Sequence, residues 1–425
     1  MTPQRSGTGS DVGRWFQAGR WHDVARAAGL VSADGAVRPT VFAEMSALAA
    51  RTGAVNLGQG FPDVDGPAHV AQAAIAAIRT GHNQYPPGAG TPELRRAVVV
   101  HQERYYGLSP DPETEVLVTA GATEAIAATV LALVGPGDEV LTLEPYYDSY
   151  AAVIAMAGAE HVPVGLTAGA DGFRLDLDAL TAAFGARTRL VLLNSPHNPT
   201  GTVLTRAELE AVARLAQRWD AVVVTDEVYE HLTYDGVEHV PVATLPGMAG
   251  RTLTISSAGK TLSFTGWKIG GVTGPAELVA AVRAVKQFLT YVSGAPFQPA
   301  IAAALVDADG ATGEYVRGLA ASLAARRDLL CDGLVAAGFG VVVPRGTYFV
   351  VADGAGLGFS DGVDLCRRLP DLAGVVGVPV SAFCRAGSTT AEALRPRVRF
   401  TFVKRQDVLV EAVTRLGRLT GRGTR

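Results

Sequence analysis

The stretch from Thr252 to Gly271 holds two lysines eight residues apart, Lys260 and Lys268. The apolar, β-branched run at its start predicts a buried strand, and the Ser-Ser-Ala-Gly that follows predicts the exit of that strand into a loop. Lys260 is therefore expected at a strand end, where its amine could form a Schiff base with an aldehyde cofactor. The alternative is an ordinary surface lysine, which is what most loop lysines are.

Other polar residues follow expected strands and meet the needs of pyridoxal phosphate (PLP). A phosphate requires backbone N–H donors at a helix N-terminus, a hydroxyl group and a cation. The ring nitrogen stays protonated only beside a buried carboxylate, and Asp226 ends an apolar strand-like run. The alternative for Asp226 is the cap of a following helix. The residues expected around the phosphate are Gly121, Ala122, Thr123, Ser257 and Lys268.

Four further residues offer contacts to the ring and to a substrate. Tyr229 and Asn198 could donate hydrogen bonds to the cofactor's phenolate oxygen, and Tyr147 offers a ring face for stacking. Arg399 could bind a substrate carboxylate through two parallel hydrogen bonds. The alternative for Arg399 is a surface arginine on a strand.

The composition limits the partners and the compartment. A net charge of −4, with 18% charged residues and no long run of one sign, favours small molecules over nucleic acid or an anionic membrane. The three cysteines, Cys331, Cys366 and Cys384, are widely separated, which is typical of a reducing compartment. No apolar run has the length of a membrane span, and the first thirty residues lack the apolar core of a signal peptide. We expect a cytoplasmic protein.

The middle of the chain alternates short strand-like runs with helical runs, which predicts an α/β fold with a mainly parallel sheet. Thr205 and Glu208 form a capping box at the start of one expected helix. Ligands of such sheets bind at the carboxyl ends of the strands. The expected strands are 116–119, 139–143, 190–194 and 221–225, and the expected helices are 123–134, 147–157 and 206–219.

The flanking regions differ in pattern. An amphipathic helix is expected over 15–30, packed on the body of the protein or on a second subunit rather than acting as a lid. Helices are also expected over 69–78 and 92–105, with Tyr85 on the loop between them. The later expected elements are helices 276–289, 312–337, 361–369 and 406–419, and strands 340–343, 348–352 and 397–403. This predicts four parts: an extension (1–37), a segment joining the small domain (38–65), a large domain (66–310) and a small α+β domain (311–425).

From about residue 40 to 420 the chain resembles the class I/II aminotransferases of PLP fold type I, especially the branch of kynurenine, methionine and N-succinyldiaminopimelate aminotransferases. That resemblance implies a mainly parallel, seven-stranded type of sheet in the large domain. Seven motifs of that branch occur in order. They are Asn-Leu-Gly-Gln-Gly-Phe-Pro-Asp (56–63), Asn-Gln-Tyr-Pro-Pro-Gly (83–88), Gly-Ala-Thr-Glu-Ala-Ile (121–126), Ser-Pro-His-Asn-Pro-Thr-Gly (195–201), Thr-Asp-Glu-Val-Tyr (225–229), Ser-Ala-Gly-Lys (257–260) and Val-Arg-Phe-Thr-Phe (398–402).

The resemblance also implies a role for each matching residue. Lys260 would carry the aldimine and move the proton, and Asp226 would pair with the ring nitrogen. Arg399, Asn198 and the backbone of Gly60 would hold the substrate carboxylate. Tyr85 would reach the phosphate of the neighbouring subunit, so a complete site would require a homodimer.

Three features depart from the branch's pattern, the first being that residues 1–37 extend beyond its usual start. Gly271 stands where the branch usually has an aromatic residue, and the segment from Thr261 to Phe264 is unusual. Strand alternation predicts that position 271 faces away from Lys268, behind the cofactor. The predicted function is transfer of an α-amino group from an L-amino acid to a 2-oxo acid. By the same resemblance, residues 286–297 would reach the neighbouring subunit's pocket, and because they contain no arginine, a neutral or bulky donor is expected over aspartate.

Two alternatives to this function stay open at this point. The first is a PLP enzyme of specialised metabolism that performs elimination, substitution or C–C bond formation at an amino acid. The second, more remote, is an aminotransferase-like regulator, which would need a DNA-binding domain before the fold.

Overall fold

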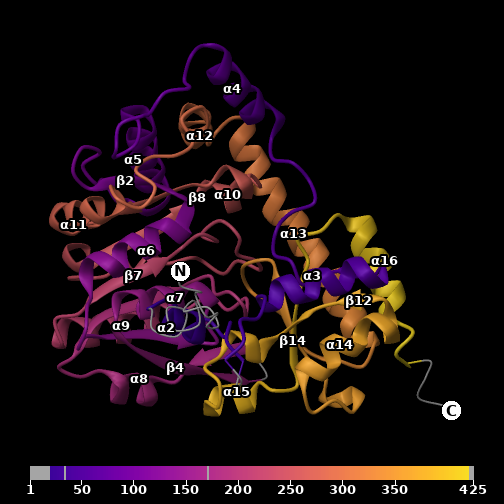
Figure 1. The fold of residues 1–425 in the computed structure, drawn as a ribbon. Coiled ribbons are helices and arrows are strands. Elements are labelled where there is room, and N and C mark those ends of the chain that lie inside the picture. The colour runs from indigo at the N-terminus through magenta and orange to yellow at the C-terminus, as the bar shows by residue number, and fades with distance from the viewer. Residues whose placement is uncertain (1–19, 33–34, 170–171, 421–425) are drawn as a thin grey trace, which may run out of the picture.

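The computed structural model describes residues 20–32, 35–169 and 172–420 (Figure 1). Within those residues the largest sheet has eight strands in the order β2-β9-β8-β7-β6-β3-β4-β5. Their bounds, in that order, are Val116–Ala120, Ile269–Thr273, Thr252–Ser257, Val222–Asp226, Thr188–Asn194, Glu139–Glu144, Glu160–Gly169 and Gly172–Leu175.

The sheet is mixed but mainly parallel, as predicted. Strands β8, β7, β6, β3 and β4 pair in parallel. Strand β9 runs antiparallel to both of its neighbours, β2 and β8, and the short strand β5 extends the sheet by folding back on β4. The seven strands from β2 to β4 therefore make the expected sheet, with β5 added at its edge.

Alternate side chains of the central strands enter two different cores, which explains why residues 190–193 of β6 and 222–224 of β7 are apolar on both faces. In β6, Leu190 and Leu192 pack with helices α6 (Gly121–Leu133), α7 (Asp148–Ala157) and α11 (Ala276–Lys286). Val191 and Leu193 of the same strand pack with α8 (Leu177–Ala183) and α9 (Arg206–Arg218) on the other face. The capping box of Thr205 and Glu208 at α9 is present.

A third group of helices packs beside the β2 edge of this sheet. Helix α12 (Phe297–Val306) lies against α4 (Ala68–Arg79) and α5 (Pro92–Tyr106), and the three share an apolar core. In Figure 1 this group forms the upper part of the molecule.

A smaller sheet, with the order β10-β11-β14-β13, lies toward the C-terminus. Helix α3 and strand β1 from the N-terminal side join its core, because β1 pairs in parallel with β12, Val55 opposite Val375. The strands of this sheet are β10 (Gly340–Val342), β11 (Phe349–Asp353), β14 (Arg397–Thr401) and β13 (Val378–Pro379). The separate pair consists of β1 (Val55–Asn56) and β12 (Val375–Val376). The helices are α3 (Val41–Thr52), α13 (Ala311–Ala336), α14 (Gly362–Ala373), α15 (Thr389–Ala393) and α16 (Gln406–Leu416).

Several element predictions need correction. Lys260 lies in a one-turn helix, α10 (Ala258–Thr261), rather than in a loop, since the Ser257 side chain caps that turn. In the described part of the chain, no helix begins directly after Asp226. Its carboxylate accepts from the N–H of Val228 in a turn, so the capping alternative is wrong. Helix α6 begins at Gly121, two residues earlier than predicted, because Gly121 adopts a positive φ of 74° at the strand exit.

The expected helix over 15–30 is described only as α2 (Trp21–Ala27), since residues 15–19 lie outside the described part. Helix α2 packs on α7, which supports packing on the body. Cys331 and Cys366 are buried and Cys384 is half-buried, all with free thiols. None of the described helices is long and apolar enough to cross a membrane.

Candidate active site

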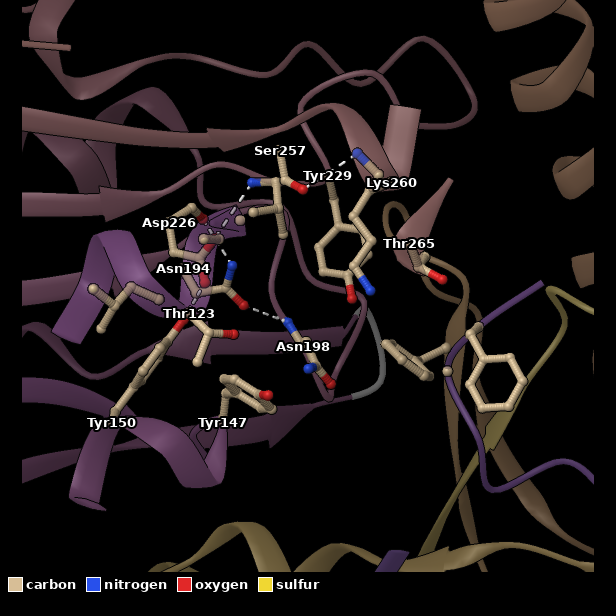
Figure 2. Close-up of a pocket in the computed structure, with 18 of the residues that line it drawn as sticks. Thr123, Tyr147, Tyr150, Asn194, Asn198, Asp226, Tyr229, Ser257, Lys260 and Thr265 are labelled. Atoms are coloured by element: carbon tan, nitrogen blue, oxygen red, sulfur yellow. Dashed lines mark hydrogen bonds between the residues drawn. The ribbon is translucent and has the colours of Figure 1, made fainter. Parts of the chain in front are cut away.

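A cavity of about 290 Å³ opens at the carboxyl ends of β6, β7 and β8, between the large sheet and the smaller one (Figure 2). All the site residues predicted from the sequence line it except Tyr85. Those lining residues are Gly60, Gly121, Ala122, Thr123, Tyr147, Asn198, Asp226, Tyr229, Ser257, Lys260, Lys268 and Arg399.

The chain has only four lysines, and their contacts separate Lys260 from the rest. Lys286 donates to the carbonyls of Gly88 and Tyr291, and Lys404 donates to that of Phe61, so both amines serve the backbone. Lys260 and Lys268 line the cavity. The Nζ of Lys260 lies 2.9 Å from the hydroxyl of Tyr348. Lys260 is thus an amine within the cavity with no carboxylate partner among the described residues.

Asp226 forms the floor of the cavity at the end of β7. It is 5% exposed, and its Oδ2 accepts a hydrogen bond of 2.6 Å from the Tyr150 hydroxyl. Burial raises the pKa of Asp226 to about 6, against the hydrogen bonds from Tyr150 and the Val228 N–H. A buried carboxylate with a raised pKa stabilises a cationic partner placed beside it.

Two asparagines hold this end of the cavity together. The Asn194 side chain donates to the Asp226 carbonyl at 2.8 Å and accepts from the Asn198 N–H at 2.7 Å. The Asn198 Oδ1 in turn accepts from Arg399 at 3.0 Å. The backbone of Asp226 and the guanidinium of Arg399 are therefore connected through a short chain of amides.

Arg399 is 2% exposed, and its guanidinium carbon lies 4.0 Å from the ring centre of Phe349 and 4.7 Å from that of Phe383. It donates to Asn198 and to the Gly58 carbonyl, and its Nε has no partner among the described residues. Burial lowers the pKa of Arg399 to about 10. A cation left without a carboxylate in an aromatic cage is suited to binding an anionic ligand.

The wall formed by α6 and β9 fits a phosphate. Gly121 and Gly270 approach so closely that a Cβ on Gly270 would lie 2.8 Å from the Gly121 Cα. Lys268 adopts a left-handed conformation (φ 55°), and its Nζ lies 3.4 Å from where a Cβ on Gly121 would be. The N–H groups of the first turn of α6, a cation and the Ser257 hydroxyl therefore face one space.

The aromatic residues predicted for the ring are also brought to the cavity. Burial raises the pKa of Tyr147 to about 12 and holds that of Tyr229 well above its usual value, so both phenols are protonated donors near neutral pH. Figure 2 shows Tyr147 and Tyr229 on opposite sides of the central space. The donor set, the glycine wall and the buried carboxylate together fit PLP.

Tyr85 is not at this cavity. Its side chain is 82% exposed and packs edge-on against Tyr291, at 5.7 Å between ring centres. Its predicted contact with a neighbouring subunit stays a prediction.

Sequence reasoning missed Tyr150, Asn194 and Tyr348. Tyr150 lies one turn of helix after Tyr147, and Asn194 ends the strand before Ser195, so strand-end position could have indicated both. Tyr348 comes from the smaller sheet and carried no such signal.

The prediction for Gly271 agrees with the structure. A Cβ there would meet only the Leu117 carbonyl within 4 Å, and Gly271 lines a second cavity rather than the first. Gly271 therefore lies behind the site, where a side chain would begin close to the Leu117 carbonyl.

Comparisons with known proteins agree with this geometry. Residues 52–416 match the family model for aminotransferases of class I and II. The probable N-succinyldiaminopimelate aminotransferase of Mycobacterium tuberculosis is 57% identical over 387 residues, covering 90% of this chain and 96% of the relative. The methionine aminotransferase of Escherichia coli is 38% identical, covering 89% and 96%. A solved structure of the M. tuberculosis N-succinyldiaminopimelate aminotransferase superposes with a TM-score of 0.86 at 56% identity, covering 90% of this chain and 97% of that one.

Proposed function

Because the chain belongs to the class I and II aminotransferases, we propose that it binds PLP in the cavity around Lys260 and moves the α-amino group of a neutral or bulky L-amino acid to a 2-oxo acid. The observation that carries the proposal is that an amine at a strand end, a buried carboxylate and a guanidinium surrounded by aromatic rings line a single cavity. They belong to Lys260, Asp226 and Arg399.

The cofactor would be held by groups already in place. The first turn of α6, Ser257 and Lys268 would bind the phosphate, Asp226 would pair with the ring nitrogen, and Tyr229 and Asn198 would donate to the phenolate oxygen. Tyr147 would cover one face of the ring. When bound, PLP supplies an electron sink for the substrate's Cα–H bond electrons.

The reaction needs one residue to move a proton, and Lys260 is placed for it. Its amine lines the cavity and takes its orientation from the Tyr348 hydroxyl, which donates to the Gly60 carbonyl at 2.7 Å. Asp226 keeps a negative charge at the far end, which favours the protonated ring nitrogen. Arg399 holds the substrate by its carboxylate, so that the Cα is presented in one orientation.

The donor preference rests on the segment from α11 to α12. Residues 286–297 contain no arginine, so that segment offers no guanidinium to a second carboxylate. Phe288 is 88% exposed and Tyr291 and Tyr85 are also exposed, a group of aromatic side chains suited to covering by a second copy of the chain. A homodimer with shared sites and a cytoplasmic location, with the four-part division given above, complete the proposal.

The name of the M. tuberculosis relative suggests a second donor class. That protein is named for N-succinyldiaminopimelate, a long donor with two carboxylates besides the α-carboxylate, and it is 57% identical to this chain. This donor belongs in the same assay. The amino-group transfer of these relatives is favoured over elimination, substitution or C–C bond formation, and over the role of a regulator.

The test is a half-reaction. Enzyme loaded with PLP is mixed with single L-amino acids and no acceptor, and the 2-oxo acid and pyridoxamine phosphate are quantified. We expect one equivalent of each per site with neutral or bulky donors, and less with aspartate. Aspartate as the best donor would overturn the donor preference. An eliminated or coupled product without any 2-oxo acid would overturn the transfer reaction itself.

A further inference from the structure

A second cavity, of about 60 Å³, lies between helix α5 and strands β8 and β9. Its lining includes His101 and Gln102 from α5, Glu230, Ser256 and Gly271. His231 follows Glu230 directly in the chain. The ligand atoms of His101, Glu230 and His231 all lie within 4.8 Å of one another.

The two imidazoles face each other through the same atom. The Nε2 atoms of His101 and His231 are 2.7 Å apart, and the rings stand at 88° to one another. Tyr105 packs against both rings, at 4.8 and 4.7 Å between centres. The two nitrogens are thus aimed at a common point by packing from α5.

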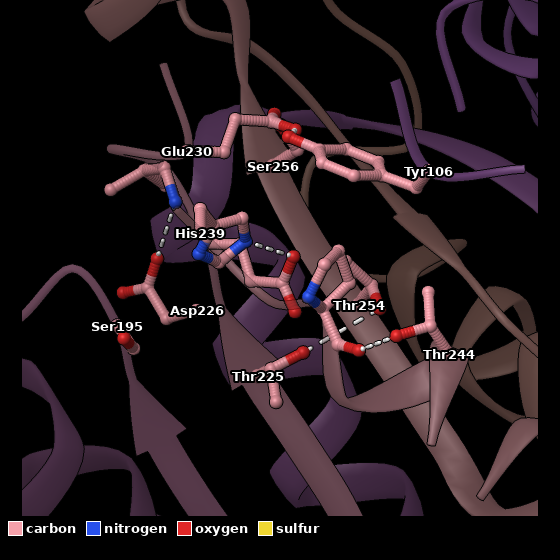
Figure 3. Close-up of polar contacts among 12 residues, drawn as sticks. Tyr106, Ser195, Thr225, Asp226, Glu230, His239, Thr244, Thr254 and Ser256 are labelled. Atoms are coloured by element: carbon pink, nitrogen blue, oxygen red, sulfur yellow. Dashed lines mark hydrogen bonds and ion pairs between the residues drawn. The ribbon is translucent and has the colours of Figure 1, made fainter. Parts of the chain in front are cut away.

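Glu230 lies beside them without a cation of its own. It is 6% exposed, and among the described residues it makes no ion pair within 4 Å. Its two oxygens accept from the hydroxyls of Tyr106, at 2.6 Å, and Ser256 (Figure 3). Each oxygen thus receives one hydroxyl donor and keeps a lone pair that a metal ion could use.

The cavity beside this cluster has room and an unused polar group. Because position 271 is glycine, no side chain fills the space in front of β9. The Gln102 side chain is 3% exposed, lines this space, and its Oε1 has no hydrogen-bond partner in the described structure. A volume of about 60 Å³ holds more than one water. Water could therefore complete a coordination sphere here and donate to Gln102.

We propose that His101, Glu230 and His231 bind a divalent transition-metal ion, with zinc as the best match, and that water from the second cavity completes its coordination. Two imidazoles and one carboxylate are a known zinc ligand set. The hydroxyls of Tyr106 and Ser256 orient the carboxylate from outside, as second partners of metal ligands commonly do.

The movements that binding requires are small. With ligands at about 2.0–2.1 Å, a tetrahedral zinc holds its ligand atoms roughly 3.3 Å apart. The two Nε2 atoms would separate slightly from 2.7 Å, and the carboxylate would approach from no more than 4.8 Å. His231 is only partly buried, so the ion has a path from solvent.

The test is zinc binding by the full-length, tag-free protein loaded with PLP. After chelation and dialysis, zinc is titrated by calorimetry and retained metal is counted by mass spectrometry. We expect one equivalent per chain, and X-ray absorption at the zinc edge should show two imidazole ligands. His101→Gln and His231→Gln should each weaken binding at least 10-fold. His82→Gln, at an exposed histidine outside the cluster, should leave it unchanged.

Tyr106→Phe is a second test that does not depend on the histidine variants folding, because it removes one hydroxyl and keeps all three ligands. It should retain one equivalent of zinc with affinity reduced by about 10-fold or less. The proposal is overturned if the wild-type protein retains no stoichiometric zinc, or if both histidine variants, folded by circular dichroism, bind zinc as tightly as the wild type. Because zinc content is the readout, these outcomes are independent of transaminase activity.

Discussion

The amine of Lys260 donates a hydrogen bond of 2.9 Å to the hydroxyl of Tyr348, the residue directly before strand β11 of the smaller sheet. The same hydroxyl donates to Gly60. One phenol thus joins the amine at the large sheet to a loop on the N-terminal side. We infer that Tyr348 fixes the direction of the amine when that amine is free to move a proton.

Tyr348→Phe should therefore lower kcat by about 10-fold, since a hydrogen bond to an amine contributes about 1–2 kcal/mol. KM for the donor should change little, because Arg399 is untouched. Steady-state kinetics checks this. Tyr234→Phe is the matched control, as Tyr234 donates to the carbonyl of Thr347 and does not reach Lys260. An unchanged kcat in the Tyr348 variant would remove the positioning role.

Lys260→Ala should abolish turnover and the visible absorbance of bound PLP. Of the other three lysines, Lys286 and Lys404 are bonded to backbone carbonyls and Lys268 faces the phosphate wall, so none replaces the amine. Absorption spectra of the loaded variant provide the measurement, with Lys404→Met as control. Wild-type spectra in Lys260→Ala would contradict the proposed cofactor chemistry.

Asp226→Asn should change stability in a pH-dependent way in the cofactor-free protein. The folded-state pKa is about 6, above the unfolded value of 3.8, so the folded protein holds this proton more tightly. The contribution to stability is then present below pH 4 and is lost as the pH rises to about 6. Asparagine does not titrate, so the Asp226→Asn variant does not lose stability at this position as the pH rises.

The variant without PLP should accordingly be more stable than the wild type at pH 8, by about 1–3 kcal/mol, with a smaller difference at pH 4.5. Urea unfolding at the two pH values measures it. With PLP bound, the asparagine variant should be the less active of the two proteins, because the ring nitrogen loses its anionic partner. A stability difference that is equal at both pH values would mean that the Asp226 carboxylate does not titrate as described.

Arg399→Ala should lower kcat/KM, with a loss of about 3–5 kcal/mol in transition-state stabilisation. The reason is that the substrate carboxylate would enter a buried aromatic site without its partner. PLP affinity should change far less. Arg397→Ala is the matched control: it lies two residues away on β14 and pairs with Asp353. Parallel losses of substrate and cofactor affinity would indicate misfolding rather than a lost contact.

The parts predicted well from sequence are those in which chemistry and local structure share one short stretch. Asp226 ends an apolar strand, and Gly121 to Thr123 begin a helix, so local pattern and parallel-strand geometry together bring them to one edge. The motif resemblance then added Gly60, which no periodicity would have joined to this edge, and it supported the carboxylate role already suggested for Arg399.

What could not be predicted depends on distant packing. Strand β9 contains Gly270 and Gly271 and lacks a strong strand pattern, and its antiparallel direction follows from pairing with both β2 and β8. Tyr348 and Phe349 at the start of β11 and Phe42 of α3 reach the site from two distant segments, and only the folded arrangement places them around Lys260 and Arg399. The cluster of His101 with His231 joins a helix and a turn for the same reason.

The pairing of β1 with β12 also constrains how the chain folds during synthesis. Val55 leaves the ribosome early, but its partner Val375 is made only near the end. The large sheet can form first, since its strands lie between the two, while the apolar residues of α3 and β1 must wait uncovered. The strand β12 therefore closes the small domain, and a nascent chain that stalls before it exposes a strand edge open to aggregation and to chaperones.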